Sequence, residues 1–178
     1  HYLSNMDVLL SCAVSAKKHG LVRPVIEAGQ ESCVDAKGMR HPLIETLSHD
    51  ELYVPNDISF SRSEKGILLY GTNAVGKSSL IKAIGISVVL AQAGYFVPCT
   101  SFNLCPYKGI FTRILGNDDI HRGLSSFAVE MLELRNILVE CTENTLVLGD
   151  ELCSGTESRS AHGIFAAGVE WLHRKRSS

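Results

Sequence analysis

The chain has 178 residues, of which 45% are hydrophobic and 20% charged, and its formal net charge is −2. This length is enough for one large domain whose core needs no support from disulfides or metal ions. A nearly neutral charge excludes the strongly basic surface by which many domains attract nucleic acid, although it says nothing about neighbouring domains.

The first predicted elements lie before residue 71. Apolar residues recur at helical spacing over 5–19, and Gly20 is placed to end that helix. A turn is predicted over 38–42, leading into a short apolar strand at 43–44, and a second turn over 53–57. Residues 67–70 form a short apolar run, which predicts a strand buried on both faces of a parallel sheet.

A phosphate-binding motif of the form GxxxxGK[ST] follows this run. With the next serine, it comprises Gly71, Thr72, Asn73, Ala74, Val75, Gly76, Lys77, Ser78 and Ser79. The two glycines let successive backbone N–H groups curl around phosphate oxygens without a Cβ in the way. We expect Lys77 to neutralise the β- and γ-phosphates of ATP and Ser78 to bind Mg²⁺. The alternative is a glycine-rich turn without a ligand.

The later elements complete an α/β pattern. A helix is predicted over 79–93, a second over 125–141, a buried strand over 145–149 and a last helix over about 158–172. Strand, phosphate-binding loop, helix, strand and helix in this order predict an α/β fold, a P-loop NTPase with a mainly parallel sheet flanked by helices.

Two acidic residues, Asp150 and Glu151, follow the strand predicted at 145–149. In P-loop ATPases the carboxylate at this strand end holds the magnesium ion, usually through water. An adjacent acid can polarise the attacking water as a general base. Asp150 is therefore a predicted Mg²⁺ ligand, and Glu151, with Lys77, a predicted catalytic residue. The alternative is an acidic pair that merely ends a strand.

Cysteine usage and hydropathy bear on the compartment. The six cysteines contain no CxxC pair, which favours buried thiols in a reducing, intracellular compartment over a zinc site. Lys82 and Gln92 interrupt the longest apolar stretch, so no membrane span is expected. Asp7 lies where a signal peptide would be basic, and the first residue is His1, so we expect an intracellular fragment. Mitochondrion, nucleus and viral factory are not distinguished.

Several blocks of the sequence together resemble the ATPase domain of the MutS family of DNA mismatch-recognition proteins. They keep the family's order and cover nearly the whole chain. The blocks are Gly38–Pro42 (G-R-H-P), Tyr53–Asp57 (F-V-P-N-D), Gly71–Ser79 (G-P-N-M-G-G-K-S-T), Gly94–Pro98 (G-x-F-V-P), Ile110–Asp119 (I-F-T-R-I-G-A-x-D-D), Gly123–Met131 (G-x-S-T-F-x-V-E-M) and Asp150–Thr156 (D-E-x-G-R-G-T).

The resemblance implies an ATPase of the ABC type that works as a homo- or heterodimer. Gly123 and Ser125 match the signature segment that would reach the γ-phosphate bound by the partner subunit, and Tyr53 matches an aromatic ring stacked on adenine. It further implies that residues 1–22 end a lever helix and 23–178 form the ATPase domain. ATP or ADP, Mg²⁺ and, through domains outside this chain, mismatched double-stranded DNA would be the partners, with no membrane. His41 is expected to support a turn, and Arg40 to form a structural ion pair.

The chain departs from the family pattern after Glu151. Ser154 stands where the family has an arginine, and Glu157 replaces a small hydroxyl residue. The sequence of this segment, Asp150–Glu157, resembles the organellar and giant-virus branch of the family. Loss of the arginine removes a bidentate partner for a carboxylate or nucleotide, which leaves open a nucleotide-dependent dimerisation module with little or no hydrolysis. A small-molecule kinase is a third class, but the arginine-rich lid expected for it is missing from 91–111.

Overall fold

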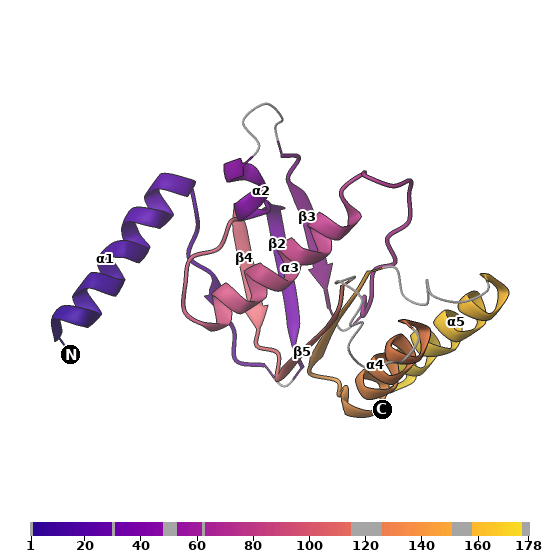
Figure 1. Ribbon diagram of the computed structural model, residues 1–178. Coiled ribbons are helices and arrows are strands. Elements are labelled where there is room, and N and C mark those ends of the chain that lie inside the picture. The colour runs from indigo at the N-terminus through magenta and orange to yellow at the C-terminus, as the bar shows by residue number, and fades with distance from the viewer. Residues whose placement is uncertain are drawn as a thin grey trace. The chain divides into compact units, whose positions relative to one another are not determined.

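The computed structural model describes residues 2–29, 31–47, 53–61, 63–114, 126–150 and 158–175. The chain forms two compact units (Figure 1). Unit 1 comprises His1–Glu64 and Leu69–Pro106, and unit 2 comprises Lys65–Leu68 and Tyr107–Ser178. The predicted boundary at residue 22 between lever helix and ATPase domain stays a prediction.

Unit 1 is built around a four-stranded mixed sheet. Its elements are α1 (Tyr2–His19), β1 (Val25–Ile26), β2 (Cys33–Met39), α2 (Pro42–Leu47), β3 (Asn56–Phe60), α3 (Lys77–Gln92) and β4 (Ser101–Cys105). The strand order is β1-β4-β2-β3; β1 pairs with β4 in parallel, while β2 pairs antiparallel with both β3 and β4. Helix α3 crosses this sheet in Figure 1. It buries Ile81, Ile84, Val88 and Ala91, a helical spacing that places them on one face.

The core face of β2 changes register at a β-bulge. Val34 and Ala36 are buried, and strict alternation would continue at residue 38, but the next buried side chain is Met39. The pairing with β3 is irregular between Ala36 and Met39, and Gly38 adopts φ +56°. A Cβ on Gly38 would lie 2.8 Å from side-chain atoms of Thr100, so only glycine fits this bulge.

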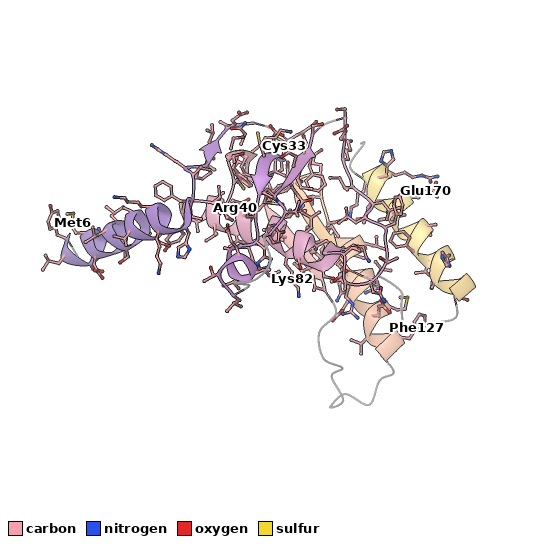
Figure 2. All side chains as sticks on the ribbon, turned by 90° about the horizontal axis from the view of Figure 1, so that it is seen from above. Met6, Cys33, Arg40, Lys82, Phe127 and Glu170 are labelled. Carbon is pink, nitrogen blue, oxygen red and sulfur yellow. The ribbon has the colours of Figure 1, made fainter. Side chains whose placement is uncertain are left out.

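Helix α1 exposes most of its apolar side chains, and only Ala16 is buried. Arg40, labelled in Figure 2, contacts its C-terminal end: Nη2 donates to the carbonyl oxygens of His19 at 3.2 Å and Gly20 at 2.8 Å. Nη1 of the same guanidinium donates to both carboxylate oxygens of Glu45, at 2.6 and 2.8 Å. A cation is favourable at the carbonyl end of a helix. The predicted ion pair of Arg40 is therefore confirmed, and the residue also caps α1.

Unit 2 contains a two-stranded parallel sheet and two helices. β5 (Gly109–Arg113) pairs in parallel with β6 (Thr145–Gly149), and the helices are α4 (Ser126–Glu140) and α5 (Ser158–Lys175). Trp171 of α5 donates from Nε1 to the carbonyl oxygen of Leu138 at 3.3 Å, and Lys175 donates to the same oxygen at 3.1 Å. These bonds tie α5 to the last turn of α4. Within the described part of the chain, no helix is long and apolar enough to cross a membrane.

The predicted fold class is wrong in its sheet. A mainly parallel sheet was expected, but two of the three strand pairs in the larger sheet are antiparallel, and the other sheet has only two strands. Strands β2 and β4 alternate between buried and less buried residues, which is typical of antiparallel strands with one core face. The alternation in β2 and β4 thus indicates antiparallel pairing, which the continuous apolar runs did not indicate.

Individual elements were predicted with mixed success. Helices α1, α3, α4 and α5 and strand β6 are confirmed, with helix ends within a few residues. Residues 67–70 form no strand, and Ile67, Leu68 and Tyr70 are exposed by 45%, 68% and 92%. Residues 43–44 lie in α2 and not in a strand, since Pro42 at the first helical position favours a helix start.

Candidate nucleotide-binding site

The predicted phosphate-binding loop is an exposed turn that leads directly into α3. Residues 71–76 are exposed, and the helix begins at Lys77. Gly76 precedes it at φ +95° and ψ +11°, a left-handed conformation that favours glycine. Ala74 also has a positive φ, +63°, which costs an L-residue roughly 1–2 kcal/mol. Left-handed residues within a turn of this kind produce the concave run of amides that binds anions, and such strain is concentrated at functional sites.

The N-terminus of α3 is suited to a negative charge. Leu80 donates its N–H to the carbonyl oxygen of Gly76 at 2.9 Å, which closes the first helical turn. No side chain caps the helix, and its first turn contains no acidic residue. The N-terminal amides of a helix point along its axis and carry a partial positive charge. A phosphate group is the kind of ligand that such an end accepts.

Lys77 brings a full positive charge to the same loop. Its Nζ donates to the carbonyl oxygens of Gly71 at 2.9 Å and Thr72 at 2.6 Å, so the side chain folds back over the start of the loop. Ser78 and Ser79, in the first turn of α3, are half-buried. The structure thus gathers the nine predicted loop residues, including Asn73 and Val75, into one turn and helix start.

The other predicted site residues are distributed over both units. Tyr53 belongs to unit 1 and is half-buried, and burial raises the pKa of its hydroxyl. Asp150 belongs to unit 2, where it is buried at the end of β6 and donates its backbone N–H to the carbonyl oxygen of Arg113 at 2.8 Å. Glu151, Gly123 and Ser125 lie outside the described residues, as do Ser154 and Glu157. The roles of all these residues stay predictions.

His41 supports a turn, as predicted. It is buried, and its Nδ1 accepts the N–H of Ile44 at 3.3 Å, which caps the N-terminus of α2. Burial is the largest cause that lowers the pKa of His41; a backbone hydrogen bond opposes it, and the positive charge of Lys82 lowers it further. The role of His41 is thus to hold the turn next to Arg40.

The lowered pKa of His41 predicts a pH-dependent stability. An unfolded histidine takes up a proton near pH 6.5, whereas the folded chain resists that protonation. The unfolded state therefore binds more protons below about pH 6.5, and the stability present above that pH falls as the pH drops through the folded pKa. Urea unfolding at about pH 7.5 and about pH 5.5 should show this loss in the wild type and a smaller loss in His41→Asn, which keeps a capping oxygen. Equal losses of stability in the wild type and in His41→Asn would contradict the assignment of this pH dependence to His41.

The chain is similar in sequence to known proteins over nearly its whole length. A family model described as MutS domain V matches residues 67–178. The mitochondrial DNA mismatch repair protein mutS homolog of Sarcophyton glaucum is 42% identical to the chain over 180 residues, 99% of this chain and 18% of that protein. A DNA mismatch repair protein mutS homolog of Acanthamoeba polyphaga mimivirus is 38% identical over 205 residues, 94% of this chain and 18% of that protein.

A bacterial relative is similar over the same region. The DNA mismatch repair protein MutS of Oceanobacillus iheyensis is 37% identical over 173 residues, 97% of this chain and 20% of that protein. The chain therefore spans about a fifth of the length of these relatives. The mitochondrial and viral proteins share slightly more residues with it than this bacterial one, in line with the predicted likeness to the organellar and giant-virus branch.

Proposed function

Because the chain belongs to the MutS family and matches its domain V over residues 67–178, we propose that it is the ATP-binding and ATP-hydrolysing part of a DNA mismatch-repair protein. In this proposal, the nucleotide state of the domain controls how the longer protein holds DNA. The relatives that it resembles carry mismatch-repair names, which support the repair role.

The observation that carries the proposal is the form of the loop before α3. Left-handed residues at Ala74 and Gly76, the uncapped helix start and the Nζ of Lys77 bring three kinds of positive potential to one exposed turn. Backbone amides, a helix N-terminus and an ammonium group are what a polyphosphate requires. The positive φ of Ala74 favours this interpretation over a glycine-rich turn with no ligand, because backbone strain of this kind is concentrated at functional sites.

Each predicted site residue has a role in the proposed reaction. Residues 71–76 and the first turn of α3 hold the phosphates of ATP or ADP, and Lys77 neutralises the β- and γ-phosphates. Ser78 and Asp150 offer oxygen atoms, the ligands that Mg²⁺ takes, and the ion would neutralise charge on the phosphates. Glu151 accepts a proton from the water that attacks the γ-phosphate.

The proposed partners are a second ATPase subunit and DNA. Gly123 and Ser125 would reach the γ-phosphate bound by the partner subunit, with the Ser125 hydroxyl as hydrogen-bond donor, so that nucleotide draws two subunits together. Mismatched double-stranded DNA would be bound by other parts of the longer protein, since the chain spans only about a fifth of its relatives. The near-neutral charge is consistent with a module that does not itself bind the DNA backbone.

Replacing Tyr53 tests whether the ligand is an adenine nucleotide. If the ring stacks on adenine, Tyr53→Ala should weaken the binding of ATP by roughly 1–3 kcal/mol and leave the binding of inorganic triphosphate unchanged, because triphosphate has no base. Calorimetry with both ligands in the presence of Mg²⁺ measures the difference. Tyr53→Phe keeps the ring and should bind ATP like the wild type. Tyr95→Ala is the control: it removes an exposed tyrosine elsewhere in unit 1 and should also bind ATP like the wild type. Equal losses for ATP and triphosphate in Tyr53→Ala would reject the stacking role.

A further inference from the structure

Two cysteines far apart in the sequence are direct partners in the sheet of unit 1. Cys33 is the first residue of β2 and Cys105 the last residue of β4, and the antiparallel register places them opposite each other (Cys33 is labelled in Figure 2). Both thiols are free. Of the cysteines in the described part of the chain, Cys12, Cys99 and Cys141 lie outside the strands and have no such partner.

The register brings both side chains to one face of the sheet. Side chains alternate along a strand, so Cys33 and Cys105 lie on the face of Asp35 and Asn103, opposite the buried Val34 and Leu104. Directly opposed residues have Cβ atoms about 4.5–5.5 Å apart, and a disulfide needs about 3.5–4.5 Å. A small closure is therefore enough, and the ends of two strands, where the ladder stops, can supply it.

The two thiols also differ in access. Cys33 is half-buried, whereas Cys105 is 8% exposed, and a Cβ on Gly29 would lie 3.0 Å from its Sγ. A hydrogen bond with Cys33 is the largest cause that raises the pKa of Cys105 to about 11, followed by burial and by the charges of Cys33 and Glu27. An oxidant from solvent therefore meets Cys33 first, while Cys105 stays protonated beside it.

We propose that Cys33 and Cys105 form a reversible oxidation site that a peroxide converts into a β2–β4 disulfide. In the first step, the sulfur of Cys33 attacks one peroxide oxygen; an S–O bond forms, the O–O bond breaks, and water leaves with the thiol proton. In the second step, the sulfur of Cys105 attacks the sulfenic sulfur; an S–S bond forms, the S–O bond breaks, and a second water leaves. The two thiols supply the two electrons that reduce the peroxide.

The first step removes one of the causes that keep Cys105 protonated. The charge of Cys33 contributes to the raised pKa of Cys105, and it is absent once Cys33 is a neutral sulfenic acid, while the burial of Cys105 is unchanged. The resulting bond would close a long loop that contains residues 71–76, the turn proposed to bind nucleotide. Long closed loops restrict the unfolded chain most, so oxidation is expected to stabilise the folded state.

Peroxide treatment of the whole chain tests this proposal. After brief exposure to hydrogen peroxide and alkylation of the remaining thiols, peptide mapping without reductant should find Cys33 joined to Cys105, and dithiothreitol should reverse the bond. The midpoint of thermal unfolding should rise by roughly 5–10 °C on oxidation. If both cysteines are still alkylated while Cys12 has been oxidised, the proposal is wrong.

Three variants separate the two steps. Cys105→Ser should leave a sulfenic acid on Cys33 that dimedone traps, because the second thiol is missing. Cys33→Ser should keep Cys105 reduced, and Cys99→Ser, which removes a buried thiol outside the strands, should form the bond as the wild type does. A disulfide from Cys105 to any other cysteine in Cys33→Ser would overturn the proposal, because register would then not select the partner.

Discussion

Lys77→Ala is expected to weaken ATP binding by about 100-fold or more, to the point where calorimetry detects none. The variant removes an ammonium group that lies over the loop through bonds to Gly71 and Thr72. A charge-assisted contact to phosphate contributes roughly 2–5 kcal/mol when one partner is truncated, which corresponds to this loss. Titration of ATP with Mg²⁺ into wild type and variant measures it directly.

Lys82→Ala is the matched control for charge and helix. Lys82 lies on the same helix α3, is exposed, and is not part of the motif (labelled in Figure 2). Its replacement changes the net charge by the same amount, so it should leave ATP affinity within about twofold, as expected for a screened surface charge. Unchanged affinity in Lys77→Ala would remove the proposed phosphate site, and equal losses in both variants would mean that net charge alone attracts the nucleotide.

Glu151→Gln is expected to lower the turnover of ATP by about 10²–10⁴-fold while ATP binding persists. The amide keeps the size of the side chain but cannot take a proton from the attacking water, and general-base catalysis contributes a factor of this order. Release of inorganic phosphate measured at saturating ATP, together with calorimetric affinity, separates the chemical step from binding.

Glu143→Gln provides the comparison for this substitution. Glu143 is exposed in the turn before β6, whereas Glu151 follows the strand. Its amide variant should hydrolyse ATP at the wild-type rate. If the wild type itself releases no phosphate at any protein concentration, the result would support the alternative of a nucleotide-dependent dimerisation module, which Ser154 in place of the family arginine allows.

Local features of the site could be predicted from the sequence because they depend on neighbouring residues. The glycine at position 76, the lysine after it and the apolar spacing of 81, 84, 88 and 91 specify a turn followed by an amphipathic helix. Strand β6 was predicted at its observed bounds, Thr145–Gly149, from a short apolar run that follows a turn. The family resemblance was likewise readable, since it rests on ordered motifs.

The arrangement of the strands could not be predicted in this way. Residues 67–70 have the composition of a buried strand, yet they are largely exposed, while the sheet of unit 1 is built from strands such as β2 that contain Asp35 and Lys37. An apolar run specifies a tendency to pair but not the partner or direction, which depend on packing across long separations in sequence.

The sequence alone therefore determined the glycine-containing turn at 71–76, the helix that follows it and the membership of the MutS family, since each is encoded in contiguous residues. Only the tertiary structure decided the antiparallel pairing of β2, the contact of Arg40 with the end of α1 and the placement of Cys33 opposite Cys105. Those contacts join residues distant along the chain, and their free energy comes from the packing of whole strands and helices rather than from any local pattern.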